Sequence, residues 1–323
     1  MEYQILRGTG ATVSRLCLGT MTFGQQVDEP EAARLLGRAL EAGVTFIDTA
    51  DAYCGGRSEE ILGRLLKGKR EQIVLASKVC GFSGVDRRRD AGLHRWHVTR
   101  GVEASLRRLQ TDCLDILYMH HPDRNTPIEE TLAAFDALVR QGKVVYVGMS
   151  NHASWQVCEA LWRAHVHHWA APVVMQVPYN LLTRSIEEEC VAFCTKMNVG
   201  MAVYNPLAGG LLTGKHTRQA GPSAGTRFQL NEGYRARFWW DANFEAVARL
   251  AGIAAEVGRS LVELSLQWLL SQPHVDAVIL GASRLGQLEE NLAAAQGRLS
   301  AETLAACDAV WKQLRGPHFA YNR

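Results

Sequence analysis

The chain has 323 residues, of which 47% are hydrophobic and 21% are charged. Its 35 Lys and Arg residues nearly balance its 33 Asp and Glu residues, which leaves a formal charge of +2. This composition is that of a soluble globular protein and excludes a disordered chain or a long coiled coil. Because no block of like charge stands out, we expect neither nucleic acid nor a membrane as a partner.

The N-terminal segment MEYQILRGTG has no basic stretch followed by an apolar core, and no apolar run approaches the roughly 20 residues of a bilayer span. We therefore expect a cytoplasmic protein. The eight cysteines form no CxxC pair and have no His at zinc-site spacing, so we predict buried reduced thiols and no metal site. Cys54 adjoins a candidate catalytic motif and could be an exposed thiol. Arg57 is the only nearby cation in the sequence that could stabilise its thiolate, so we do not expect Cys54 to be reactive.

Short β-branched runs alternate along the chain with longer amphipathic stretches, a pattern typical of parallel strands joined by crossover helices. The predicted strands are 16–20, 44–50, 73–79, 114–120, 144–150, 173–177, 199–205 and 277–283. Helical patterns that end in glycine cover 30–43, 58–68, 128–142 and 285–297. At this length the alternatives are two domains or one barrel. Eight strands without a linker predict a single α/β domain over 1–323, a (β/α)8 TIM barrel.

Two segments depart from this alternation of strands and helices. Residues 3–6 and 11–14 flank a turn that contains glycine, which predicts an N-terminal β-hairpin able to close the bottom of the barrel. Residues 209–240, after the seventh strand, hold Gly, Pro, Ser, Arg and aromatic residues without a clean period. A long irregular segment in a compact domain is usually functional or disordered, so we expect a long loop here.

Active sites of such barrels lie at the carboxyl ends of the strands. The polar residues at those ends are Asp48, Lys78, His120, Ser150, Asn151 and Gln176, and Tyr53 follows in the loop after the second strand. Each of them alone has an ordinary explanation, such as a helix cap, a solvated strand end or a satisfied histidine. Their convergence from separate strands favours an active site.

The residue types suggest a proton-transfer unit. A phenol has a pKa near 10, and a neighbouring ammonium such as Lys78 would lower it, which would make Tyr53 a general acid. Asp48 would pair with Lys78, and His120 would donate a hydrogen bond to a carbonyl oxygen. Since no side chain can donate a hydride, the arrangement implies a nicotinamide cofactor.

The motifs FIDTADAY (46–53), ASKV (76–79) and LDILYMHHP (114–122) resemble the tetrad motifs of the aldo-keto reductase superfamily. The resemblance extends over the chain, through LGTMTFG (18–24), GRSEE (56–60), VGMSN (147–151), VPYN (177–180), YNPLAGGLLTGK (204–215) and LGASRLGQLEEN (280–291). It implies the TIM barrel and a catalytic tetrad of Asp48, Tyr53, Lys78 and His120. The tetrad histidine stands two residues before the proline in the family, which selects His120 over His121.

The resemblance also implies NADPH/NADP+ bound in an extended form across the barrel mouth, although the chain has no GxGxxG turn. Ser150, Asn151 and Gln176 would hold the carboxamide, and Tyr204 would stack on the nicotinamide ring. Ser283 and Arg284 would bind the 2'-phosphate. Lys215 and Arg227 would reach the pyrophosphate, although a solvated loop cation is an equal alternative for Arg227. The remaining implied positions are Gly19, Thr20, Met21, Asp48, Asn205, Pro206, Leu207, Gly209, Gly281, Gln287, Glu290 and Asn291.

For the substrate, a small carbonyl compound, the expected contacts are Phe23, Tyr53, His120 and His121. Trp239, Trp240 and residues 318–323 are further candidates for the pocket wall, although aromatic residues more often belong to the core. The specific substrate and the oligomeric state stay open at this point.

The expected function is NADPH-dependent reduction of an aldehyde or ketone. One alternative is a regulatory subunit that binds NADP(H) and resembles the channel β-subunits of the superfamily. The start of the fold within a few residues of Met1 favours the enzyme. Another alternative is a lyase or isomerase that uses Lys78 as a Schiff base, which would leave Tyr204 and the LGASR segment without a role.

Overall fold

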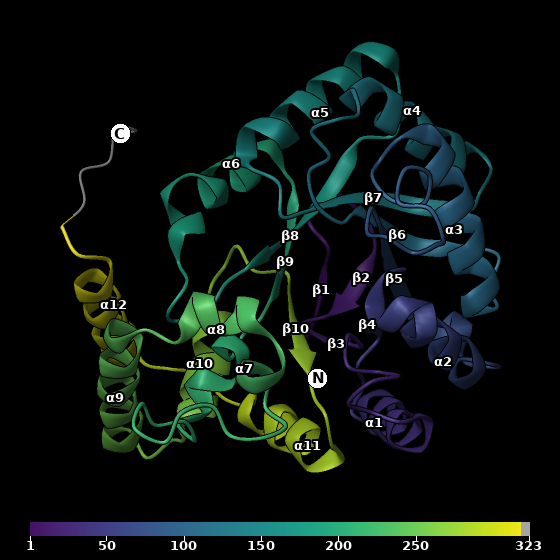
Figure 1. The fold of residues 1–323 in the computed structure, drawn as a ribbon. Coiled ribbons are helices and arrows are strands. Elements are labelled where there is room, and N and C mark those ends of the chain that lie inside the picture. Colours follow the sequence, from purple (N-terminus) through teal and green to yellow (C-terminus); the bar gives the residue numbers. More distant parts are fainter. Residues whose placement is uncertain (318–323) are drawn as a thin grey trace.

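The computed structural model describes residues 1–317. Eight parallel strands close into a barrel in the order β10-β3-β4-β5-β6-β7-β8-β9, and helices surround it (Figure 1). The strands are β3 (Leu16–Gly19), β4 (Phe46–Asp48), β5 (Val74–Val79), β6 (Leu114–Met119), β7 (Val144–Ser150), β8 (Pro172–Pro178), β9 (Gly200–Tyr204) and β10 (Ala277–Gly281). Each strand overlaps a predicted run, so the TIM barrel is confirmed.

Within the described residues, one α-helix follows each strand from β3 to β8, four α-helices lie between β9 and β10, and two follow β10. They are α1 (Glu29–Glu41), α2 (Arg57–Leu65), α3 (Arg95–Leu109), α4 (Ile128–Arg140), α5 (Ser154–His167), α6 (Cys190–Met197), α7 (Arg227–Leu230), α8 (Glu232–Phe238), α9 (Asp241–Glu256), α10 (Leu261–Leu270), α11 (Leu285–Ala294) and α12 (Ala301–Arg315). The glycines after the four predicted helices all adopt positive φ, between +70° and +98°. Glycine enters this left-handed region without a Cβ clash, which explains why the helices end there.

The predicted hairpin consists of β1 (Tyr3–Ile5) and β2 (Thr12–Ser14), which pair antiparallel. Leu6 and Val13 are fully buried and belong to the same apolar cluster as the barrel residues Cys17 and Phe46. The hairpin therefore inserts two apolar side chains into the amino-terminal end of the barrel and closes it.

Successive side chains of a strand point to opposite faces, and this alternation builds the barrel interior. Phe46, Ala76 and Tyr118 belong to the inner cluster, whereas their neighbours Ile47 and Leu117 belong to the outer cluster under the helices. A residue two positions further along each strand faces inward again. That position holds Asp48 in β4, Lys78 in β5 and His120 directly after the end of β6, so the polar groups form a layer above the apolar one.

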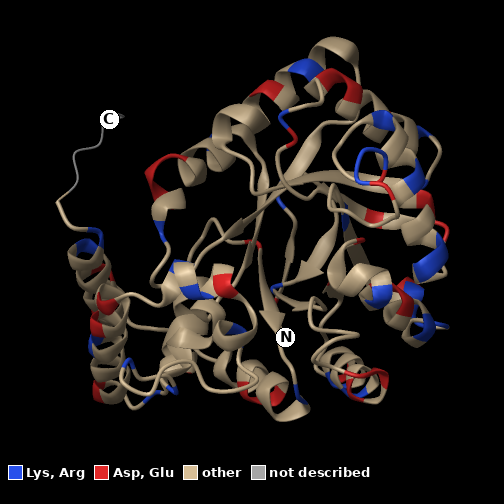
Figure 2. Ribbon diagram, viewed as in Figure 1, with Lys and Arg blue, Asp and Glu red and all other residues tan. Residues whose placement is uncertain are grey.

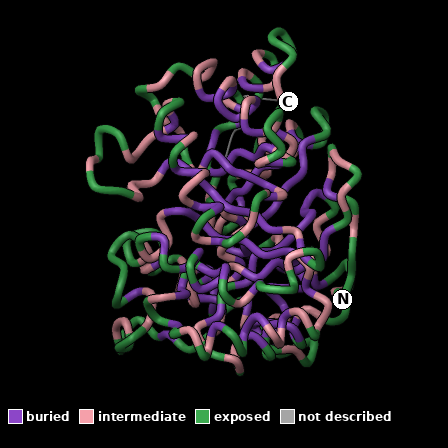
Figure 3. Tube along the Cα trace, turned by 90° about the vertical axis from the view of Figure 1, so that its right-hand side faces the viewer, coloured by how far each residue is buried: buried purple, intermediate pink, exposed green. Residues whose placement is uncertain are grey.

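The positions of the buried and the charged residues agree with a barrel surrounded by helices. Buried residues concentrate at the centre of the molecule, and exposed segments lie at its periphery (Figure 3). Acidic and basic residues are interspersed along the outer helices (Figure 2). No helix within residues 1–317 is long and apolar enough to cross a membrane.

Residues 209–240 are more ordered than predicted. A 3-10 helix (Ala208–Thr213) and the short helices α7 and α8 occupy much of the segment. Phe228 and Trp239 pack edge to face with ring centroids 5.2 Å apart, and His216 and Phe244 extend the cluster. Aromatic packing of this kind holds the segment together and joins it to α9.

The cysteines are all free. Cys17, Cys80, Cys194 and Cys307 are buried, as predicted, whereas Cys113 and Cys190 are only half-buried and Cys158 is exposed on α5, which corrects the prediction of buried thiols at these three positions. Cys54 is half-buried, and burial raises the pKa of its thiol, so it is no activated thiolate.

The hairpin plug leads to a stability prediction. Leu6→Ala leaves a cavity in the closed end of the barrel, so it should lower the free energy of unfolding by about 2–5 kcal/mol. Ile5→Ala, at a neighbouring side chain that is 60% exposed, should change it by less than about 0.5 kcal/mol. Urea unfolding followed by tryptophan fluorescence measures both, and equal effects would mean that Leu6 does not plug the barrel.

Candidate active site

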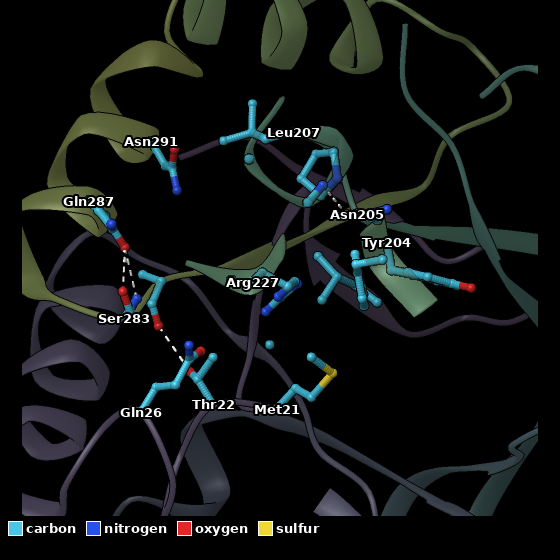
Figure 4. Close-up of a pocket in the computed structure, with 18 of the residues that line it drawn as sticks. Met21, Thr22, Gln26, Tyr204, Asn205, Leu207, Arg227, Ser283, Gln287 and Asn291 are labelled. Carbon is cyan, nitrogen blue, oxygen red and sulfur yellow. Dashed lines mark hydrogen bonds between the residues drawn. The ribbon is translucent and has the colours of Figure 1, made fainter. Parts of the chain in front are cut away.

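A cavity of about 810 Å³ opens at the carboxyl ends of the strands. This volume lies in the range of small-molecule sites. Its lining includes every position that the sequence predicts for the cofactor. Ser283, Gln287 and Asn291 lie along one wall, with Tyr204 and Asn205 opposite (Figure 4). Barrel closure therefore brings together residues from both halves of the chain.

Lys78 lies beneath the floor of this cavity, with only 1% of its surface exposed. Its ammonium donates three hydrogen bonds, to Asp48 Oδ1 at 2.5 Å, to the Thr49 carbonyl at 2.7 Å and to the Tyr53 hydroxyl at 3.0 Å. An ammonium has three N–H donors, and all three are used. Burial lowers the pKa of Lys78, but Asp48 and Tyr53 more than offset this, and the net pKa is raised. Lys78 is therefore a fixed cation.

Asp48 is also held on its other side. Gln176 donates from Nε2 to Asp48 Oδ2 at 2.8 Å, so both carboxylate oxygens are bonded. This contact ties β8 to β4 across the barrel mouth. It also means that the Gln176 amide supports the ion pair in addition to lining the cavity.

Tyr53 begins a tight turn after β4. Cys54, Gly55 and Gly56 all have positive φ, which turns the chain back and places the phenol over Lys78, whose Nζ lies 4.7 Å from the ring centroid. Burial raises the pKa of Tyr53, and the Lys78 charge opposes this only in part. The expectation of a lowered Tyr53 pKa is therefore wrong for this structure, because desolvation of the phenolate outweighs its attraction to the ammonium.

His120 stands beside Tyr53, with ring centroids 5.8 Å apart in an edge-to-face arrangement. Burial, with the positive charge of Lys78 and then the neighbouring His121, lowers the pKa of His120 to about 3. Its imidazole is therefore neutral near pH 7 and can still donate one hydrogen bond. His121 also lines the cavity, and its Nδ1 contacts the Cys80 thiol at 3.2 Å.

Asn151 forms hydrogen bonds with several residues of the cavity wall next to His120. Its Nδ2 donates to the His120 carbonyl and to Ser150 Oγ, both at 3.0 Å, and its Oδ1 accepts from the Tyr204 hydroxyl at 2.7 Å. The residue has φ +61°, a conformation that asparagine tolerates better than most residues. One amide thus sets the positions of Ser150 and Tyr204 relative to His120.

The opposite end of the cavity is built on the start of α11. Gln287 Oε1 accepts from the Ser283 amide at 2.9 Å and from Ser283 Oγ at 3.0 Å (Figure 4). Glu31, on α1, accepts from the Leu285 amide at 2.6 Å. The side chain of Arg284 is exposed beside them. The sequence does not predict Glu31 at this place, because only closure of the barrel between β10 and β3 brings α1 and α11 together.

Two further cavity residues, Tyr234 and Arg237, lie on α8 and are not predicted from the sequence. The Arg227 guanidinium lies 4.9 Å from the Tyr234 ring centroid, and that of Arg237 lies 5.8 Å from it. Arg227 lies on α7, contacts the Tyr234 ring and lines the cavity, and its contact with a cofactor stays a prediction. The spacing of aromatic and basic residues in 227–237 is the only signal of this in the sequence.

Three predicted pocket residues lie elsewhere. Phe23 is fully buried in the apolar cluster between the barrel and the helices and is not among the cavity residues. Trp239 and Trp240 line a separate small hollow, since Trp239 is held in the aromatic cluster. Residues 318–323 lie outside the described part of the chain. Within that part, no group of three or more His, Cys, Asp or Glu side chains could hold a metal ion.

Comparisons with known proteins agree with this geometry. Residues 15–312 match the model of the aldo/keto reductase family. This chain belongs to the aldo/keto reductase family. It is 39% identical over 312 residues to the human aflatoxin B1 aldehyde reductase member 2, covering 91% of this chain and 85% of the relative. It is 36% identical over 317 residues to an uncharacterized oxidoreductase of Bacillus subtilis, covering 94% of each. A probable voltage-gated potassium channel subunit beta of Arabidopsis thaliana is 38% identical over 302 residues, covering 91% of each.

The family and its reductase relatives support carbonyl reduction by an oxidoreductase as the general activity. Members of the aldo/keto reductase family generally use a nicotinamide cofactor, NADH or NADPH.

Another buried carboxyl group lies in the segment after β4, between Asp48 and Tyr53. Asp51 is fully buried, and its Oδ2 lies 4.0 Å from His97 Nε2. Burial and then repulsion by Glu59 raise the pKa of Asp51 to about 7, although Arg108 opposes them. The Asp51 amide donates to the Lys78 carbonyl at 3.1 Å, so the Asp51 backbone is held next to β5.

This pKa predicts a pH dependence of stability. In the unfolded chain an Asp has a pKa near 4, so the folded state takes up the additional proton between about pH 4 and pH 7. The contribution of Asp51 to stability is therefore present at low pH and is lost as pH rises to about 7. Urea unfolding should show that the wild type, relative to Asp51→Asn, loses on the order of 2–4 kcal/mol between pH 4 and pH 8.

The exposed Asp112 offers the matched control, since Asp112→Asn should leave the pH dependence of the wild type unchanged. If Asp51→Asn also follows the wild type at every pH, Asp51 does not titrate in this window.

Proposed function

We propose that the protein reduces an aldehyde or ketone to an alcohol with NADPH, in a reversible reaction in which Tyr53 supplies the proton. The observation that carries this proposal is the Lys78 ammonium, which is bonded to Asp48 and to the Tyr53 hydroxyl at the floor of a large cavity. Membership of the aldo/keto reductase family and the aldehyde reductase among its relatives support it.

The residues of the cavity fit a phosphorylated dinucleotide. Lys215, Arg227 and Arg284 line it as cations, and Arg284 immediately precedes α11, where a helix start also favours anions. Ser150 and Asn151 offer hydroxyl and amide groups that match a carboxamide, and they lie near the tetrad. When bound, a reduced nicotinamide supplies the hydride that no side chain can provide.

Each tetrad residue has a task in this reaction. The raised pKa of Tyr53 keeps the proton on the phenol near pH 7, which an acid requires before it donates to the substrate oxygen. The Lys78 ammonium, fixed by Asp48, stabilises the phenolate that remains. The neutral His120 donates a hydrogen bond to the same substrate oxygen and orients the carbonyl carbon.

Schiff-base chemistry at Lys78 is disfavoured. A nucleophilic amine must lose its proton, whereas the net pKa of Lys78 is raised and its three donors are bonded. The alternative of a regulatory subunit has less support than the enzyme, because binding a nucleotide alone requires no buried ammonium aimed at a phenol. Eight free cysteines suit a reducing compartment, and we place the protein in the cytoplasm.

Tyr53→Phe removes the proton donor and keeps the ring. Turnover of a good carbonyl substrate should fall by about 10²–10⁴-fold, while NADPH affinity should stay within about twofold of the wild type. Loss of NADPH absorbance measures turnover across a panel of aldehydes and ketones. Tyr3→Phe, on the distant hairpin, is the matched control and should retain full turnover. Near wild-type turnover in Tyr53→Phe would remove Tyr53 as the acid.

Arg284→Ala tests the choice of cofactor. A charge-assisted contact to phosphate contributes about 1.5–3 kcal/mol, so NADPH should bind roughly ten- to a hundredfold more weakly. NADH affinity should hardly change, because NADH has no 2'-phosphate. Quenching of tryptophan fluorescence measures both affinities, and Arg298→Ala, an exposed arginine outside the cavity, serves as the control. An equal loss for both cofactors would contradict the assignment of Arg284 to the 2'-phosphate.

A further inference from the structure

Three sulfur atoms meet on the outer side of the barrel, between β8 and α6. Met175 lies on β8, and Cys190 and Cys194 lie one turn apart on α6. The Met175 sulfur lies 3.4 Å from Cys194 Sγ and 3.8 Å from Cys190 Sγ, and the two cysteine sulfurs are 4.0 Å apart. The three atoms form a nearly regular triangle.

The size of this triangle matches a metal site. A point equidistant from the three sulfurs lies about 2.2 Å from each of them, close to the length of a metal–thiolate bond, about 2.3 Å. Three ligands could therefore bind one ion in a trigonal arrangement with little movement of the chain. Thiolates and a thioether are soft donors that select Cu(I), whereas Mg²⁺ and Ca²⁺ require oxygen ligands.

We propose that Met175, Cys190 and Cys194 form a binding site for one soft monovalent metal ion of the Cu(I) class. The third ligand is a thioether, so the site differs from clusters built only of His, Cys, Asp and Glu. This metal site is a function separate from carbonyl reduction, and the proposal does not depend on the reductase activity. Met175 points to the outer face of β8, whereas the next residue, Gln176, lines the cavity.

The site has an entrance on one side. Met175 and Cys194 are fully buried, but Cys190 is half-buried at the first residue of α6. Glu189, before it, has φ −147° and ψ −48°, so the helix begins abruptly and Cys190 lies in its first turn. A helix N-terminus favours a thiolate, which suits Cys190 as a metal ligand.

Binding has a simple proton balance. Each thiol loses its proton to solvent, two metal–thiolate bonds and one metal–thioether bond form, and no atom changes its oxidation state. The occupied site would carry one negative charge. The Arg7 guanidinium contacts Thr195 at 3.5 Å, next to Cys194. Arg7 therefore offsets part of the cost of that buried charge.

Titration with Cu(I) against a colorimetric Cu(I) chelator, on the full-length reduced protein under anaerobic conditions, tests the site. The wild type should bind one Cu(I) tightly, and X-ray absorption should show three sulfur ligands at about 2.2–2.3 Å. Cys194→Ala removes a thiolate and should weaken binding by more than about a hundredfold. Met175→Leu keeps the volume and should weaken it by roughly tenfold or more. Losses of this size are expected, because changing a residue that only supports a metal ligand already lowers metal affinity by about 10–100-fold.

Cys158→Ala, at the exposed cysteine of α5, is the matched control and should bind Cu(I) as the wild type does. Thermal melting of each variant checks that it is folded, and the near-isosteric Met175→Leu keeps the test decisive if Cys194→Ala unfolds. Wild-type affinity in Met175→Leu, or a two-sulfur linear absorption spectrum, would overturn the three-sulfur site. Failure of wild-type protein to compete with the chelator would overturn the proposal as a whole.

Discussion

The ammonium of Lys78 lies inside the protein, and an isolated buried ammonium would cost several kcal/mol. Its three N–H donors require three acceptors, which Asp48, the Thr49 carbonyl and Tyr53 provide. Asp48 in turn needs a second partner and finds it in Gln176 on the far side of the barrel. The position of the Tyr53 hydroxyl therefore follows from the need to satisfy one buried charge, and the chemistry proposed for the site depends on this arrangement.

The strands and the polar ends of the site could be predicted from the sequence, because alternation along parallel strands is a local property. Asp48 and Lys78 each stand two residues after an inward apolar residue, so their meeting at the barrel mouth follows from the fold. The pKa of Tyr53 could not be predicted in the same way. It depends on how deeply the turn after β4 buries the phenol, and burial reverses the effect expected from Lys78 alone.

Contacts between elements that are far apart in the sequence account for the other differences between the predicted and the observed positions of side chains. Phe23 was expected at the substrate but is buried in the outer core, and Trp239 packs against Phe228 instead of the cavity. Glu31 reaches the first turn of α11 only because β10 pairs with β3 and closes the barrel. In each case the side chain's environment is set by a neighbour far away in the sequence. Periodicity carries no information about such neighbours.

The most direct test of this account is a double-mutant cycle of turnover with Asp48→Asn and Lys78→Met, with thermal melting to check folding. If Asp48 acts by fixing Lys78, each variant lowers turnover, and the double variant is no worse than about the more damaging single one. The coupling should be at least about 1 kcal/mol, well above the roughly 0.5 kcal/mol seen for independent sites. Strictly additive effects would contradict the claim that the buried ion pair and Tyr53 act as one unit.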